Sequence, residues 1–259
     1  MGFWEVLILS FIEGMTEYLP ISSTGHLIIT SALMGIQDEG FIKSFNVIIQ
    51  FGAILSVLVL YWRRFLPDLN FYKKLIIGFL PAAVIGLLVK KKIDLILGSV
   101  QIVAWALIIG GILLIISDRI FSHQNTHGKK IEDLSWKDCL KIGLIQCFAF
   151  IPGVSRSAAT ILGGLSLGLN RRQAAEFSFF LAVPTLSGAA LVKSLGLITT
   201  IESSQISWLL IGTGLSFIFA LFAIKFFIEL VSRFGFKHFG AYRIVLGIAL
   251  LLFIYGGYI

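Results

Sequence analysis

Two carboxylates four residues apart, Glu13 and Glu17, stand in an otherwise apolar part of the chain. On a helix this spacing puts both side chains on one face. Like charges so placed repel each other unless a cation lies between them, and Mg²⁺ commonly binds through one or two carboxylates plus substrate phosphate oxygens. The pair therefore indicates a divalent metal site. The alternative is a solvated pair at a helix end in the water interface.

A run of hydroxyl side chains and a histidine follows Pro20 and leads into an apolar stretch: Ser22, Ser23, Thr24, Gly25 and His26. One hydroxyl is explained as the N-cap of the next helix, but three hydroxyls and a histidine need another reason. A helix N-terminus rich in hydroxyl and N–H groups binds anions. His26 fits a general acid, a general base or a nucleophile, and equally a hydrogen-bonded core histidine.

A second motif, Ser155, Arg156 and Ser157, follows Pro152 and Gly153 in the same way. Arginine suits bidentate contact with phosphate, and it stays charged when buried. An ion pair of Arg156 with Glu13, Glu17 or Glu176 is the competing interpretation. Carboxylates, hydroxyls, histidine and arginine together favour metal-assisted phosphoryl transfer over proton coupling.

The composition indicates an integral membrane protein, because 57% of the 259 residues are hydrophobic, 14% are charged and the mean hydropathy is +0.94. Six apolar runs have lengths near those that cross a bilayer: 45–62, 75–89, 101–117, 177–195, 208–228 and 241–258. They are continuous, which predicts helices and excludes a barrel. The net charge of +7 is dispersed over the connections, so nucleic acid is not expected as a partner.

The chain also resembles one sequence used twice, since an offset of 132 residues places Ser23 on Ser155 and Thr24 on Arg156. We expect a first repeat at 1–120, a connection at 121–135 and a second repeat at 136–259. Each repeat would hold one re-entrant helix–loop–helix hairpin, 5–35 or 138–168, and three transmembrane helices. The predicted fold is thus an all-α polytopic membrane protein with an inverted-topology repeat, a design that many transporters share.

Lys and Arg residues give an independent prediction of orientation. Placing the 63–74 connection in the cytoplasm puts 118–141, 169–176 and 225–243 there as well. Most Lys and Arg residues outside the apolar runs then lie on the cytoplasmic side, as the positive-inside rule requires. The connection at 121–135 is therefore predicted to be cytoplasmic.

The motifs and the stretches 45–52, 61–64 and 176–184 resemble the undecaprenyl-diphosphate phosphatase (BacA/UppP) family over essentially the whole chain. The resemblance implies a bacterial inner-membrane enzyme whose site opens to the periplasm and uses a divalent metal. Its reaction would convert C55 isoprenyl diphosphate to the monophosphate and inorganic phosphate. This recycles the lipid carrier of cell-wall synthesis and confers resistance to bacitracin.

Carried over to this sequence, the resemblance makes Glu13 and Glu17 the metal ligands, with Glu17 also catalytic. Ser23 and His26 match the candidate nucleophile and proton-transfer residues, and Arg156 matches the phosphate-binding arginine, with Ser155 beside it. Phosphate contacts are also expected from Ser22, Thr24, Gly25 and Ser157. Attack by Ser23 with help from His26 is favoured, with His26 itself or metal-bound water as alternatives.

Several expectations accompany this interpretation. The metal is expected to be Mg²⁺, with Ca²⁺ as the alternative. The substrate is a polyprenyl diphosphate whose tail stays in the lipid, and a homodimer is left open. The rival function is a transporter or flippase that moves a phosphorylated polyprenyl lipid and uses the same site for binding alone.

Overall fold

The computed structural model describes residues 1–37, 40–66, 68–96, 99–121, 128–197 and 201–257. Over these residues the ordered segments are helical, apart from an isolated bridge between Lys129 and Leu169. The helices are α1 Phe3–Thr16, α2 Ser23–Leu33, α3 Gly40–Ile48, α4 Gln50–Leu60, η1 Trp62–Phe65, α5 Leu69–Ile96, α6 Val100–Ile120, η2 Ile131–Asp133, α8 Trp136–Gln146, η3 Cys147–Phe150, α9 Arg156–Ser166, α10 Arg171–Leu197, α11 Ser203–Phe234 and α12 Lys237–Tyr255.

Six helical segments are long and apolar enough to cross a bilayer, as the sequence predicts. Their bounds are Gly40–Leu60, Leu69–Val89, Val100–Ile120, Arg171–Gly196, Gln205–Phe234 and Lys237–Tyr255. Most begin several residues before the predicted apolar runs, because the helices continue through their charged or polar first turns. The first span is formed by α3 and α4, which are separated only at Ile49.

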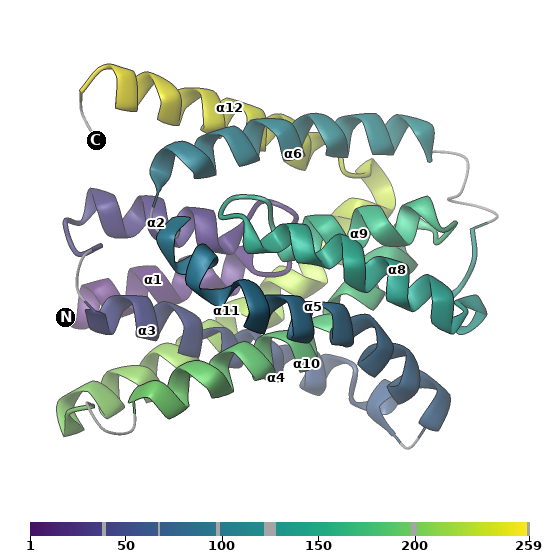
Figure 1. Cartoon of the computed structure of the whole chain (residues 1–259), viewed down its shortest axis with the longest axis horizontal. Helices are drawn as coiled ribbons and strands as arrows, with labels where there is room; N and C mark the ends of the chain where they lie inside the picture. Colours follow the sequence, from purple (N-terminus) through teal and green to yellow (C-terminus); the bar gives the residue numbers. More distant parts are fainter. Residues whose placement is uncertain (38–39, 67, 97–98, 122–127, 198–200, 258–259) are drawn as a thin grey trace.

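Two pairs of short helices lie between the long ones. Helices α1 and α2 approach the middle of the molecule from the end that holds both termini, and α8 and α9 approach it from the opposite end (Figure 1). The hydroxyl of Ser157 at the start of α9 donates to the carbonyl of Leu19 over 2.8 Å, so the two breaks meet. The predicted helix–loop–helix segments are therefore present, and their irregular backbone faces protein.

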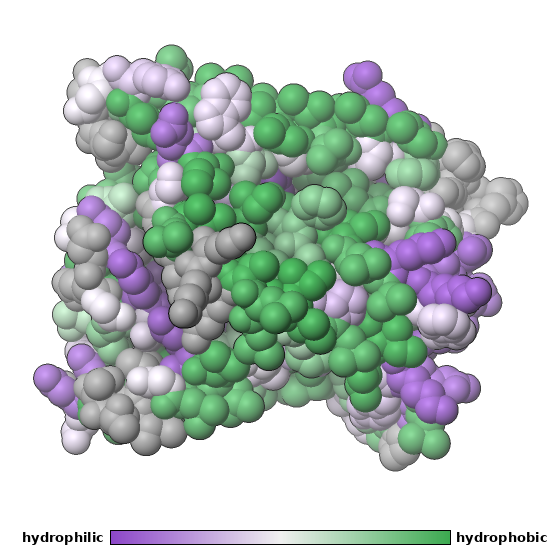
Figure 2. Space-filling model, in the orientation of Figure 1, coloured by the Kyte–Doolittle hydropathy of each residue, from purple (hydrophilic) through white to green (hydrophobic). Residues whose placement is uncertain are grey.

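The connections that carry most of the basic residues gather at one end of the molecule. The amine of Lys74 donates to the carbonyl of Ile131 over 3.0 Å, and Arg171 pairs with Asp118 over 2.6 Å. The backbone N–H of Lys129 donates to the Gly168 carbonyl over 2.8 Å. The connections following α4, α6 and α9 thus lie together, as their shared charge predicts. Figure 2 shows hydrophilic residues at the ends and a hydrophobic surface across the middle.

Helices α6 and α12 pack through small residues that bring their backbones close. A Cβ added at Gly240 would lie 2.6 Å from the carbonyl oxygen of Gly111, and one at Gly247 would lie 2.7 Å from that of Ala104. Such contacts are typical of helix pairs in membranes, where close packing replaces the hydrophobic driving force. This contact holds α12 against the middle of the molecule, beside both breaks.

Candidate active site

Each of the two helix breaks contains a proline and ends at a serine N-cap. The first lies between α1 and α2 and contains Pro20, and the second lies between η3 and α9 and contains Pro152 and Gly153. Proline cannot donate a backbone hydrogen bond, and Gly153 adopts a φ of +92°, which glycine tolerates best. Each break therefore ends one helix and lets the next one start in a new direction.

The N-caps of α2 and α9 are serines in an unusual backbone conformation. Ser22 has a φ of 72° and Ser155 a φ of 76°, and these are the non-glycine residues with positive φ in the described chain. Each hydroxyl oxygen accepts a hydrogen bond over 3.2 Å, from the N–H of Gly25 and of Ala158 respectively. Non-glycine residues in this region are strained, and such strain clusters at functional sites.

The two cap positions differ by one residue from the alignment of the two motifs expected from sequence. Ser22 corresponds to Ser155, and the first helical residues Ser23 and Arg156 correspond to each other. The structural offset is thus one residue longer than the sequence comparison predicts. The offset predicted from sequence aligned the two prolines, but the cap positions decide where each helix starts. Arg156 and Ser23 therefore hold the same position after their caps, whereas the offset expected from sequence pairs Arg156 with Thr24.

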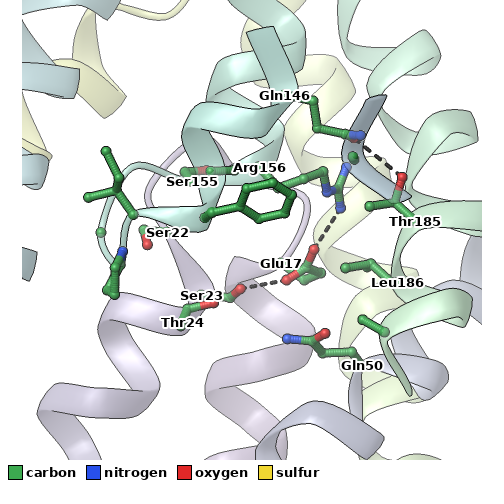
Figure 3. A pocket seen from close by; sticks show the side chains of 17 residues that line it. Glu17, Ser22, Ser23, Thr24, Gln50, Gln146, Ser155, Arg156, Thr185 and Leu186 are labelled. Carbon is green, nitrogen blue, oxygen red and sulfur yellow. Dashed lines mark hydrogen bonds and ion pairs between the residues drawn. The ribbon is translucent and has the colours of Figure 1, made fainter. Parts of the chain in front are cut away.

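Glu17 joins the two breaks through both of its carboxylate oxygens. Its Oε1 lies 2.6 Å from Nη2 of Arg156, and its Oε2 accepts a hydrogen bond from the hydroxyl of Ser23. Figure 3 shows Glu17 between these two partners. Of the three ion pairs weighed from sequence, the structure contains the one with Glu17. Arg156 also donates through Nη1 to the carbonyl of Ser178 over 2.9 Å, which fixes the guanidinium further.

A cavity of about 180 Å³ lies where the two breaks meet. Its polar lining is Glu17, Ser22, Ser23, Thr24, Gln50, Gln146, Ser155, Arg156 and Thr185 (Figure 3). Two side chains of this lining have a buried donor without a hydrogen-bond partner among the described residues, namely Nε of Arg156 and Nε2 of Gln146. Unsatisfied buried donors are costly and rare, so this cavity is suited to an anion.

Sequence reasoning missed three of these lining residues: Gln50 of α4, Gln146 of α8 and Thr185 of α10. Thr185 donates to Gln146 over 3.4 Å and to the Leu181 carbonyl over 2.8 Å. Each is a polar residue within a largely apolar stretch of the chain. A polar residue at membrane depth is itself a functional signal, and that signal was available from the sequence.

Four of the predicted site residues lie outside the cavity lining: Glu13, Gly25, His26 and Ser157. His26 is half-buried, with Nδ1 2.7 Å from the Ser22 carbonyl and Nε2 2.7 Å from the Tyr242 hydroxyl. Both ring nitrogens are therefore in contact with protein. The structure places His26 behind the Ser22 cap. Ser157 lies 3.0 Å from the Ser155 hydroxyl and supports the other cap.

Glu13 is fully buried, and neither of its carboxylate oxygens has a hydrogen-bond partner in the described chain. It lies close enough to Glu17 for the two carboxyl groups to interact. The described residues contain no group of three or more His, Cys, Asp or Glu side chains that could hold a metal. A cation bound by this carboxylate pair would therefore need other oxygen ligands.

Arg243 was assigned from sequence to a cytoplasmic connection, and that assignment is wrong. It lies within α12, is fully buried, and donates hydrogen bonds to the carbonyls of Pro20, Gly153 and Val154 among others. The charge count treats every Lys and Arg near a helix end as a topology signal. A buried arginine that binds backbone carbonyls does not obey that rule.

Comparison with known proteins finds relatives that match nearly the whole chain. The model of a family described as bacitracin resistance protein BacA matches residues 6–249. A protein of Bdellovibrio bacteriovorus named undecaprenyl-diphosphatase is 57% identical over 258 residues, which cover 100% of this chain and 98% of that protein. Proteins of the same name from Flavobacterium psychrophilum and Porphyromonas gingivalis are 51% and 42% identical. They match 97% and 99% of this chain and 96% and 98% of their own lengths.

Proposed function

The chain belongs to the BacA family, and on that basis we propose that it is a membrane-embedded phosphatase that hydrolyses undecaprenyl diphosphate. The products are undecaprenyl monophosphate and inorganic phosphate. The reaction recycles the lipid carrier of cell-wall synthesis and accounts for resistance to bacitracin. The relatives named undecaprenyl-diphosphatase support this at up to 57% identity over the full length.

One observation carries the assignment to this cavity: its buried donors have no partner within the protein. Arg156 Nε and Gln146 Nε2 are unsatisfied, and the N-termini of α2 and α9 both lie at the lining. Helix N-termini and arginine are the groups that proteins use for phosphate. We assign phosphate contacts to Arg156, Ser155, Ser22 and Thr24. Gly25 acts indirectly, because its backbone N–H binds the Ser22 hydroxyl, and Ser157 acts indirectly through its contact with the Ser155 hydroxyl.

The hydrogen bond from Ser23 to Glu17 supports Ser23 as the nucleophile. Glu17 takes the proton as Ser23 Oγ forms a bond to the terminal phosphorus. The bond from that phosphorus to the bridging oxygen breaks, and undecaprenyl monophosphate leaves. Water then hydrolyses the phosphoserine to release inorganic phosphate. Arg156 orients Glu17 and binds the phosphate, and His26 acts through the Ser22 carbonyl.

A divalent metal, Mg²⁺ or alternatively Ca²⁺, fits the unpartnered oxygens of Glu13 together with Glu17. When bound, such an ion would stabilise negative charge on the phosphate oxygens. Glu13, in the last turn of α1, and Glu17, directly after that helix, would hold it. The fully buried position of Glu13 supports this assignment, because a buried carboxylate needs either a proton or a cation.

We further propose that the hairpins 5–35 and 138–168 are re-entrant and belong to inverted repeats at 1–120 and 136–259. The matching serine caps and the opposite directions of the two helix pairs support this. With the basic connections in the cytoplasm, the chain lies in the bacterial inner membrane and the site opens to the periplasmic side. A homodimer stays a prediction.

The decisive experiment measures phosphate release from undecaprenyl diphosphate by the purified chain in detergent. Arg156→Ala should lower kcat by about 10²- to 10³-fold, the size of loss expected when a charge-stabilising donor is removed. Arg172→Ala is the matched control, because Arg172 is largely exposed and pairs with Glu176 outside the cavity. A wild type that releases no phosphate would refute the phosphatase, and equal rates in Arg156→Ala and the wild type would refute the assignment of the reaction to this cavity. Lipid movement across vesicles without hydrolysis would favour a flippase.

A further inference from the structure

Arg243 uses all of its hydrogen-bond donors on backbone carbonyls. Its Nη1 donates to Pro20 over 2.9 Å and to Val154 over 3.0 Å. Its Nη2 donates to Gly153 over 2.9 Å and to Ala106 over 3.0 Å, and its Nε contacts the Leu107 carbonyl at 3.4 Å. A guanidinium has five N–H donors, so each one has a partner.

These carbonyls come from three separate parts of the chain. Pro20 belongs to the first break, Gly153 and Val154 belong to the second, and Ala106 and Leu107 belong to α6. None of the ion pairs in the described residues includes Arg243. An arginine held at this depth without a carboxylate is costly, and its carbonyl partners alone compensate it. Its contacts therefore indicate that Arg243 links the two breaks.

The hydrogen bonds also set the direction of the peptide groups in both breaks. The C=O and N–H of a trans peptide point in opposite directions, and the described chain contains no cis peptide. Carbonyls of Pro20 and Val154 that face Arg243 therefore turn the N–H groups of Ile21 and Ser155 away from it. Ser155 forms part of the second of these peptide groups, and Ser22 is the residue after the first. Both serines line the cavity.

We propose that Arg243 is a positioning residue that fixes the two breaks relative to each other. It holds Ser23 and Glu17 of the first half opposite Arg156 of the second half, in the geometry that phosphoryl transfer requires. Arg243 does not line the cavity and acts without touching the substrate. The proposal rests on the proposed function, but the contact between the breaks is testable without activity.

Gly110 on α6 provides a second way to disturb the same contact. A Cβ at this position would overlap Nη2 of Arg243. Gly110→Ala therefore displaces the guanidinium while leaving Arg243 in the chain. Gly214 on α11 has no atom within 4 Å of an added Cβ, so Gly214→Ala is its matched control. Arg171→Lys is the control for Arg243→Lys, because Arg171 is a mostly buried arginine in an ion pair with Asp118.

The test combines hydrogen–deuterium exchange with steady-state kinetics on monodisperse protein in detergent. Arg243→Lys has three donors in place of five, and both it and Gly110→Ala should speed exchange about tenfold in segments 17–24 and 151–157 together. Their kcat should fall about 100-fold, the loss that a misplacement of roughly 1 Å can cause. KM should change less than about threefold, since Arg243 makes no contact with substrate. Both controls should resemble the wild type.

Unchanged exchange in either segment would overturn the proposal, because the breaks would then not depend on Arg243. Faster exchange in both segments with an unchanged kcat per folded protein would mean that Arg243 stabilises the breaks without positioning the reacting groups. That result would also overturn the proposal. A wild type that releases no phosphate would instead refute the proposed function, while exchange would still report whether Arg243 couples the breaks.

Discussion

Glu13 shows at the level of a single residue how burial and charge constrain function. Its two carboxylate oxygens are buried without a hydrogen-bond partner in the described chain, directly beside Glu17. Glu17 differs from it, because Arg156 and Ser23 satisfy both of its oxygens. A buried carboxylate without a partner is destabilising unless a proton or a cation accompanies it. We therefore expect Glu13 to be the residue on which the metal response depends.

Replacing Glu13 by Gln should weaken the response to Mg²⁺. In the wild type, EDTA should abolish phosphate release, and saturating Mg²⁺ should raise the melting temperature through preferential binding to the folded state. Glu13→Gln should need about tenfold more Mg²⁺ for half-maximal activity, as carboxylate ligands contribute strongly to Mg²⁺ binding. Thermal melting and a Mg²⁺ titration of phosphate release measure this, with Glu229→Gln as an exposed control. A melting temperature of Glu13→Gln that still rises with Mg²⁺ like the wild type's would contradict it.

The sequence predicted most residues of the central contact, because carboxylate, hydroxyl and guanidinium groups are conspicuous in an apolar chain. Glu17, Ser23 and Arg156 do meet, although they lie up to 139 positions apart. The role of Arg243 could not be assigned in this way. Its partners are backbone carbonyls from distant segments, which local composition does not reveal.

At the level of elements, helix starts were easier to predict inside the two motifs than along the spans. The prolines and serines of the motifs end one helix and cap the next, so α2 and α9 begin close to where their residues indicate. The long helices α5 and α10 instead begin in charged turns and continue through Pro81 and Pro184. Hydropathy reports the width of the bilayer core and not the length of the helix, which explains the shorter predicted spans.

The start of α8 provides a pH-dependent prediction. Ser135 Oγ accepts from the Asp138 N–H over 3.2 Å and donates to Asp138 Oδ2 over 2.8 Å. This contact with the Ser135 hydroxyl lowers the pKa of Asp138 in the folded protein. The contact therefore stabilises the fold fully above the pKa of Asp138 in the unfolded chain, about 4, and this stabilisation is lost as the pH falls through the pKa of Asp138 in the folded protein. Ser135→Ala should therefore cost about 1 kcal/mol at neutral pH and less near pH 3.

Thermal melting in detergent at both pH values checks this prediction. The matched control is Ser99→Ala, because Ser99 caps α6 by accepting from the Ile102 N–H over 3.3 Å without a carboxylate contact among the described residues. Its destabilisation should be the same at both pH values. A loss in Ser135→Ala that does not shrink in acid would show that the Asp138 charge contributes nothing to the cap.

At the scale of the whole molecule, the two ends differ in charge, and the breaks lie between them. The contacts of Lys74 with Ile131 and of Arg171 with Asp118 tie the basic connections into one end. The opposite end holds the start of α1 and the start of α11 (Figure 1). By the positive-inside rule, this asymmetry predicts one orientation for all six spans. In the proposed arrangement each hairpin would enter and leave on its own side.

Labelling of single cysteines in intact cells tests both the orientation and the re-entrant hairpin. In a background with Cys139 and Cys147 replaced by Ala, Glu202→Cys, Gly2→Cys and Gln37→Cys should react with an impermeant maleimide added outside the inner membrane. Lys130→Cys should react only after permeabilisation, because it lies at the basic end. All four positions are exposed in the structure. Reaction of Lys130→Cys from outside would reverse the orientation, whereas opposite sides for positions 2 and 37 would mean that α1 and α2 cross the membrane together. Such a crossing would remove the inverted repeat, since the two hairpins could no longer enter from opposite sides to form one site.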